Sequence, residues 1–223
     1  MHCSPRTRLL QAGVLFAVLS TPALAEKEGV IVRRPGEIEF TATVNSKAFD
    51  SGPAMPGYHA IVWRGGKAAH AALLEAEVTD RQVLEAIEAM GGKPGDNLPM
   101  ESWEERKNPK NPAPDLVIAG PAVDVFLRLP GRREPVALQS VLEDPGGRGL
   151  SMRFGGNSAN IPKWKSGCIV CLYSCPGSKV GNAKYTVRDY ASDATRFRVR
   201  PGVLPPDGTP VRVILRLASA GAG

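Results

Sequence analysis

The pattern of apolar and polar residues predicts many short β-strands. The clearest is residues 37–44, where Ile38, Phe40, Ala42 and Val44 alternate with polar side chains, the period of two that is typical of a half-buried strand. Further strands are expected at residues 29–33, 59–63, 68–78, 115–119, 123–129, 136–138, 150–154, 183–190, 197–199 and 211–217, and a helical turn is expected at 138–142.

One segment has the period of an amphipathic helix. Thr79 and Gln82 have the spacing of a capping box, Val83 and Ile87 recur on one face, and two glycines follow Met90. These signals predict a helix over residues 79–90. Residues 98–114 contain four prolines and no apolar period, so an extended insertion is expected there.

Turn residues divide the chain throughout. The 24 glycines and 20 prolines are spread along the sequence and form no domain-scale linker. Short strands joined by turns and a single clear helix predict an α+β fold: a mostly antiparallel, β-rich single domain over residues 26–223 with one main helix.

The first 25 residues have the pattern of a secretory signal peptide. Arg6 and Arg8 precede an apolar stretch at residues 9–19, and Ala23 and Ala25 form a small-residue cleavage site before Glu26. We therefore expect a periplasmic or secreted protein. No later stretch is apolar and long enough to span a bilayer, so no transmembrane segment is expected in the mature chain.

Charge and motifs narrow the function further. The formal net charge is +6 for the whole chain, and the basic residues are scattered, without the basic helix or aromatic-basic interleaving of a nucleic-acid-binding surface. We expect no nucleic-acid partner. The sequence contains no nucleophile elbow, zinc-protease, phosphate-loop or dinucleotide-binding motif, and we do not predict an enzyme.

The chemistry is concentrated in residues 164–178. Cys168, Cys171 and Cys175 have the spacing C-x2-C-x3-C and are followed by proline. Cys3, the other cysteine, lies in the predicted signal peptide, so the mature chain retains an odd number of thiols. An unpaired thiol in an exported protein suggests a metal, an intermolecular bond or redox chemistry.

An iron–sulfur cluster is one interpretation of this segment. Bacterial clusters use C-x2-C-x2-C-x3-C-P, and this chain matches the last part of that pattern with Lys165 at the missing position. A complete site needs a fourth ligand: His59, His70, a carboxylate, solvent or another subunit.

Three other interpretations remain open, and one is that the cysteines are free or otherwise structural thiols. A zinc site would combine the three cysteines with one histidine. A disulfide between Cys175 and either Cys168 or Cys171 would suit an oxidising compartment and needs no cofactor.

The cysteine segment resembles the YdjY domain family. The resemblance rests on residues 166–177, on Gly181-Asn182-Ala183 and residues 185–190, and on earlier stretches at 70–74, 91–95 and 153–157. Family members are exported or lipid-anchored bacterial proteins described as 4Fe-4S ferredoxin-like. The resemblance therefore implies a [4Fe-4S] cluster at Cys168, Cys171 and Cys175, and implies no known reaction.

These observations predict an exported metal-binding or iron–sulfur protein in electron transfer or metal handling, with a redox or envelope protein of unknown identity as partner. The alternative is a non-enzymatic envelope binding or assembly module in which the cysteine loop is a structural disulfide.

Overall fold

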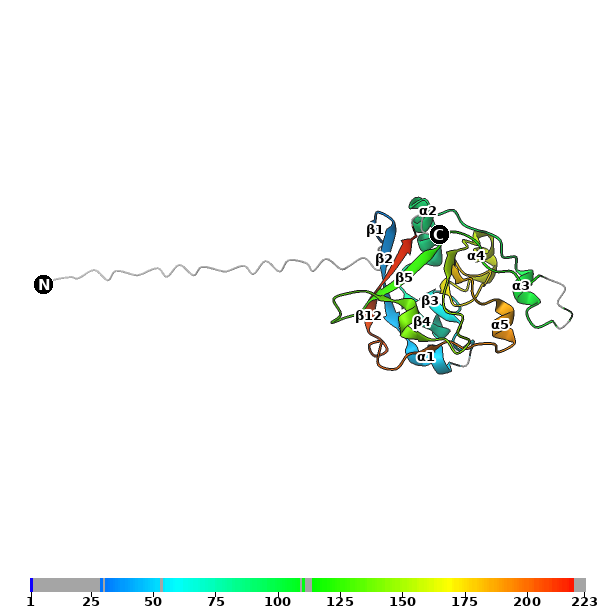
Figure 1. Ribbon diagram of the computed structural model, residues 1–223. Coiled ribbons are helices and arrows are strands. Elements are labelled where there is room, and N and C mark those ends of the chain that lie inside the picture. Colours follow the sequence, from blue (N-terminus) through cyan, green and yellow to red (C-terminus); the bar gives the residue numbers. More distant parts are fainter. Residues whose placement is uncertain (2–28, 30, 53, 109, 111–113, 219–223) are drawn as a thin grey trace.

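The computed structural model describes residues 1, 29, 31–52, 54–108, 110 and 114–218 (Figure 1). Residues 2–25 of the expected signal peptide, and its cleavage site before Glu26, lie outside the described residues. Across the described part of the chain, every helix is too short or too polar to cross a bilayer.

A curled mixed sheet is the main element. Its strands follow the order β6-β5-β12-β2-β4-β3-β9-β10-β8, and β1 pairs with β2 beside this path. The strands are β1 (Val32–Arg34), β2 (Glu37–Val44), β3 (His59–Trp63), β4 (Ala72–Ala76), β5 (Val123–Arg128), β6 (Val136–Ala137), β8 (Met152–Phe154), β9 (Cys168–Cys171), β10 (Val180–Asn182) and β12 (Pro210–Leu217). β7 (Leu142–Glu143) and β11 (Arg198–Val199) form a separate pair.

The expectation of a mostly antiparallel sheet is only partly confirmed. Most pairs are antiparallel, including the long pairing of β12 with both β2 and β5. However, β3 pairs parallel to β4, and β9 pairs parallel to β10. The sheet is therefore mixed at the end that carries the cysteines.

The expectation of one main helix is also only partly confirmed. The described residues form five α-helices: α1 (Ser46–Ser51), α2 (Asp80–Ala89), α3 (Glu101–Glu104), α4 (Ile161–Trp164) and α5 (Val187–Ala191). Three 3-10 turns add to them: η1 (Ala69–Ala71), η2 (Leu138–Val141) and η3 (Ser158–Asn160). α2 is the longest, and its predicted capping box is present, with Thr79 accepting from the Gln82 amide and Gln82 accepting from the Thr79 amide.

One strand prediction is confirmed only in part, and two others are wrong. The segment 68–78 begins with η1, and its strand is limited to β4. Residues 183–190 form a turn and α5, because Thr186 and Asp189 make a second capping box that outweighs the β propensity of the nearby tyrosines and valine. Residues 115–119 form no strand, and the expected extended insertion contains α3.

The core lies along the central strands. Ile38, Phe40, Ala42 and Val44 are buried as the alternation predicted. Burying one large apolar side chain contributes about 1.5–3 kcal/mol, so this row helps to fix the register of β2. Glu39 on the same strand is also buried, and its carboxylate accepts from Arg212 Nε at 2.8 Å.

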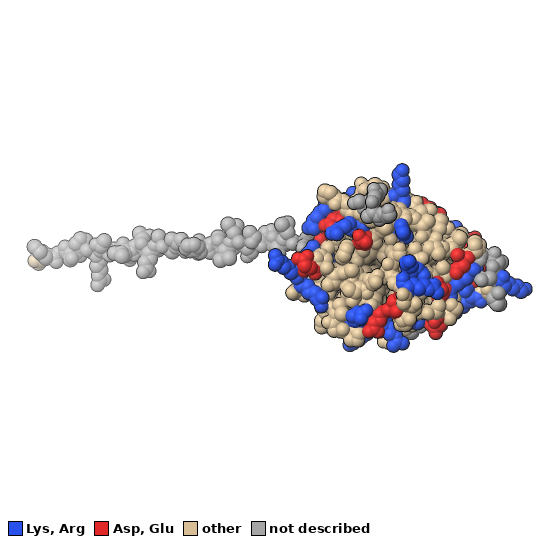
Figure 2. All heavy atoms as spheres, viewed as in Figure 1, with Lys and Arg blue, Asp and Glu red and all other residues tan. Residues whose placement is uncertain are grey.

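The visible surface carries charges of both signs. Figure 2 shows lysine and arginine side chains interspersed with acidic ones, separated by uncharged residues. On this face the charges form no broad area of one sign.

Candidate metal centre

The site is built where β3 and β9 pair antiparallel. His59 lies opposite Cys171, and Val62 lies opposite Cys168. In a regular strand, residues three apart point to opposite faces, so Cys168 and Cys171 would diverge. The pairing shifts register between His59 and Val62, and such an irregularity absorbs one residue and re-aims a side chain. The bulged pairing thus accounts for both thiols facing His59.

Three ligand atoms converge at this point. One ring nitrogen of His59 and the Sγ atoms of Cys168 and Cys171 all lie within 4.8 Å of one another. The two cysteines are fully buried and His59 is only 5% exposed. His59 Nδ1 is buried without a hydrogen-bond partner among the described residues. A buried imidazole nitrogen normally has a partner, so this orphaned atom fits a ligand role.

Cys175 lies next to this group, in the loop after β9. It is fully buried and contacts the Cys171 thiol. Ser178 holds the turn, because its amide and hydroxyl both donate to the Cys175 carbonyl, at 3.1 and 2.7 Å. Asn160 Nδ2 donates to the carbonyl of Pro176 at 2.9 Å. Cys168, Cys171 and Cys175 are all free thiols in this structure.

The two strand cysteines have opposite acid–base tendencies. The pKa of Cys168 is lowered to about 5, chiefly by contact with the Cys171 thiol and further by His59 and Lys179. Burial raises the pKa of Cys171 well above its usual value, and the neighbouring Cys168 and Cys175 add to that rise. One thiolate is therefore favoured at neutral pH, and a second is opposed by the like charge beside it.

A buried ion pair supplies positive charge near the thiols. Lys179, with a side chain only 1% exposed, lies 3.3 Å from Asp80 at the start of α2 and donates to the Gly177 carbonyl at 3.0 Å. Its charge helps to lower the pKa of Cys168. Lys179 thus couples the cysteine loop to the longest helix.

Aromatic rings enclose the other side of the cysteines. Tyr58 stacks on Tyr173 at 4.8 Å between ring centroids and meets Tyr190 edge-on at 4.6 Å. Burial raises the pKa of Tyr58 well above its ordinary value, and the nearby Cys175 and Cys171 raise it further. Its hydroxyl is buried and has no hydrogen-bond partner within the described residues.

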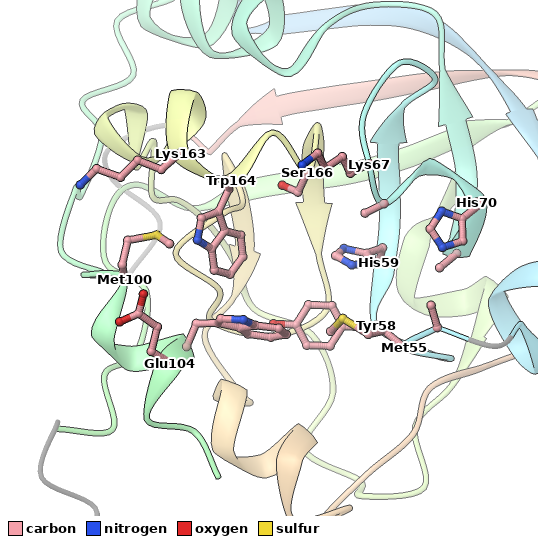
Figure 3. Close-up of a pocket in the computed structure, with 14 residues that line it drawn as sticks. Met55, Tyr58, His59, Lys67, His70, Met100, Glu104, Lys163, Trp164 and Ser166 are labelled. Carbon is pink, nitrogen blue, oxygen red and sulfur yellow. The ribbon is translucent and has the colours of Figure 1, made fainter. Parts of the chain in front are cut away.

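A pocket of about 550 Å³ opens onto His59. Figure 3 shows Trp164 above its space, with Tyr58 below and the His59 ring pointing inward from β3. The full lining is Ala54, Met55, Tyr58, His59, Lys67, Ala68, His70, Ala71, Met100, Trp103, Glu104, Lys163, Trp164 and Ser166. The candidate centre is therefore buried but borders a cavity.

The structure separates the two histidines that the sequence offered as ligands. His59 joins Cys168 and Cys171, whereas His70 is exposed on the pocket wall and lies outside the group of converging atoms. Sequence reasoning did not single out Lys179 or Tyr58. Both stand next to a residue of interest, Tyr58 before His59 and Lys179 after the cysteine loop, and that proximity was the only available signal.

The donor set determines what the site can hold. Two thiolates and an imidazole are soft to borderline ligands that suit zinc and Cu(I). A single ion draws its ligands close together, with Zn–S bonds of about 2.3 Å and Zn–N bonds of about 2.0–2.1 Å. The compact group of three atoms fits one ion, and Cys175 is near enough to Cys171 to be considered a fourth donor.

The family resemblance can be tested against known proteins. Residues 31–216 match the model of the YdjY domain. The chain is also 32% identical over 161 residues to "Uncharacterized protein YdjY" of Escherichia coli (strain K12), an alignment that covers 72% of this chain and 67% of that protein. No solved structure matches the chain significantly. Neither match describes a metal or a cluster, so the ferredoxin-like part of the resemblance stays a prediction. The extent of both matches shows that the chain belongs to the YdjY domain family.

Proposed function

We propose that this protein is an exported metal-binding protein that holds one soft metal ion through His59, Cys168 and Cys171, with Cys175 as the fourth donor. The observation that carries the proposal is the buried group of His59, Cys168 and Cys171 ligand atoms within 4.8 Å of one another. Export rests on the N-terminal sequence pattern. The role we assign is metal handling.

The electrostatics of the site support a cation. A second buried thiolate at Cys171 is unfavourable beside Cys168, and a bound metal ion removes that repulsion because it deprotonates coordinating thiols. Lys179 contributes positive charge but is already paired with Asp80. A bound cation is therefore favoured, because the buried positive charge near the thiols is too small to stabilise two thiolates alone.

An iron–sulfur cluster with an electron-transfer role is the second candidate. It is favoured by the C-x2-C-x3-C-P spacing. In a [4Fe-4S] cluster each cysteine thiolate binds a different iron, which requires protein ligands spread around a larger body than one ion. The close approach of the His59, Cys168 and Cys171 atoms favours the single ion.

The test is elemental analysis of protein purified without oxygen, with acid-labile sulfide measured on the same sample. We expect about one equivalent of metal and no sulfide. Substitution with Co²⁺ should give the strong near-ultraviolet absorption of thiolate ligation. Stoichiometric iron and sulfide would replace the single-ion site with a cluster, and absence of any metal, even after anaerobic reconstitution, would overturn both.

Matched variants identify the ligands. We expect His59→Ala, Cys168→Ser and Cys171→Ser each to weaken binding by more than 100-fold, since loss of a supporting outer-shell group alone costs 10–100-fold. His70→Ala is the control, because His70 lines the same pocket outside the group. Equal effects of His59→Ala and His70→Ala would refute the assigned ligand set. Far-ultraviolet circular dichroism checks that each variant folds.

A further inference from the structure

The pocket beside His59 has the walls of a small-molecule site. Its volume of about 550 Å³ falls in the usual range of about 300–1,000 Å³ for such sites. Trp164 and Trp103 meet edge-on at 5.2 Å, and Trp103 meets Tyr58 at 5.8 Å. Aromatic rings on several sides favour a flat, largely apolar occupant.

Two polar groups mark one corner of this pocket. Figure 3 shows the Lys67 side chain beside Ser166, above His59. The two segments are fixed together, because the amides of Lys67 and Ala68 donate to the carbonyls of Lys165 and Ser166 at 3.0 and 3.1 Å. Gly66 permits this approach, since a Cβ there would clash with the Ser166 carbonyl.

This corner is suited to an anion. No ion pair or hydrogen bond engages the Lys67 ammonium within the described part of the chain. The Ser166 hydroxyl accepts from the Cys168 amide at 3.3 Å, which leaves its own proton available to donate. A cation and a hydroxyl donor side by side favour a carboxylate or a similar anionic group.

The other charged groups on the pocket wall are placed differently. Lys163 also belongs to the lining, but its ammonium points away from the cavity in Figure 3. Glu104 is the acidic residue of the lining, and in Figure 3 it lies beside Met100, on the opposite side of the pocket from Lys67.

We infer that this pocket binds a small, flat aromatic molecule with one anionic group, its ring lying among Trp164, Trp103 and Tyr58 and its anion at Lys67 and Ser166. The inference goes beyond the proposed metal site and shares with it only His59. The occupant would cover the side from which His59 can be reached.

The experiment measures binding of 2-naphthoate by calorimetry and by nuclear magnetic resonance of the tryptophan indole N–H groups. The chain has three tryptophans. Naphthoate should shift the signals of Trp103 and Trp164 and leave Trp63, which lies outside the pocket lining, unchanged. Absence of binding at millimolar probe, or equal shifts of all three signals, would overturn the inference.

Probe charge and matched variants test the anion corner. We expect 2-naphthylmethylamine to bind at least tenfold more weakly than naphthoate, and 2-naphthylmethanol to fall between them. Lys67→Gln should lower naphthoate affinity about tenfold without changing that of the alcohol, whereas Lys163→Gln should change neither. Equal effects of the two lysine variants would refute the assignment of Lys67.

Two further variants keep the test independent of folding and of the metal. Ala68→Leu adds volume to the lining while preserving every aromatic ring, and should abolish naphthoate binding. The double variant Cys168→Ser/Cys171→Ser should lose metal but still bind naphthoate. Loss of metal and probe together in this folded variant would contradict a pocket that acts separately from the metal site.

Discussion

Replacing Lys179 with methionine removes the charge of the buried ion pair beneath the cysteines while keeping a similar length. At 3.3 Å from Asp80, the two charges attract by about 5 kcal/mol at an effective dielectric constant of about 20. Much of that is offset by the cost of burial, but removing one partner leaves an uncompensated charge and typically costs about 3–5 kcal/mol. We expect Lys179→Met to lower the free energy of unfolding by about that amount.

Urea unfolding of the metal-free protein at pH 7 measures this loss, and a double-mutant cycle isolates the pair. Asp80→Asn should also destabilise, and the double variant should lose at least about 2 kcal/mol less than the sum of the two. Arg64→Met is the control, because Arg64 is half exposed and 3.9 Å from Glu77; it should cost less than about 1 kcal/mol. Additive losses for Lys179→Met and Asp80→Asn would refute the argument.

Three further predictions concern the cysteine loop. Stability of the metal-free protein should rise from pH 5 to about 8.5 by up to about 1.4 kcal/mol per unit, because folded Cys168, with its lowered pKa, has released a proton that the unfolded thiol retains. Above that range stability should fall with pH, because unfolded Cys171 ionises before the folded thiol. Urea unfolding at several pH values measures both trends, and the rise between pH 5 and about 8.5 should be flatter in Cys168→Ser. Gly177→Ala should displace the Trp164 ring, which occupies the position of the added methyl group, and cost about 1–3 kcal/mol, with a changed Trp164 indole signal as the readout. Asn160→Ala removes buried hydrogen bonds to the carbonyls of Leu98 and Pro176 and should cost about 1–3 kcal/mol; faster hydrogen exchange at residues 175–178 is expected, and unchanged exchange would contradict it.

Elements with a strong local pattern were predicted from sequence. The strand at residues 37–44 has the predicted bounds, and α2 begins at its expected capping box. Residues 183–190 show the limit of such reasoning. Their β-forming tyrosines and valine suggested a strand, but the Thr186–Asp189 capping box produces α5. Short helices depend on single contacts such as this one, and residue composition does not show whether the contact or the β propensity will prevail.

The site was only half visible in the sequence. The spacing drew attention to Cys168, Cys171 and Cys175, but it could not choose between His59 and His70. That choice depends on which strand pairs with β9 and on the irregular register between them. Both are tertiary features, set by packing between segments about a hundred residues apart, and no local pattern reports them.

The placement of β2 and β12 also bears on how the molecule is made. These strands come from opposite ends of the described chain yet pair in the interior of the sheet order, and Arg212 reaches Glu39 across 173 positions of sequence. Such distant contacts slow folding. During synthesis, β5 and β6 cannot join β2 until β12 has been translated, because β12 lies between them. A nascent chain that lacks β12 therefore keeps open strand edges at β2 and β5. A truncation before Pro210 would remove the long pairing that holds β5 to β2 through β12, and would leave β5 joined to β8 at the bridge between Ala122 and Arg153.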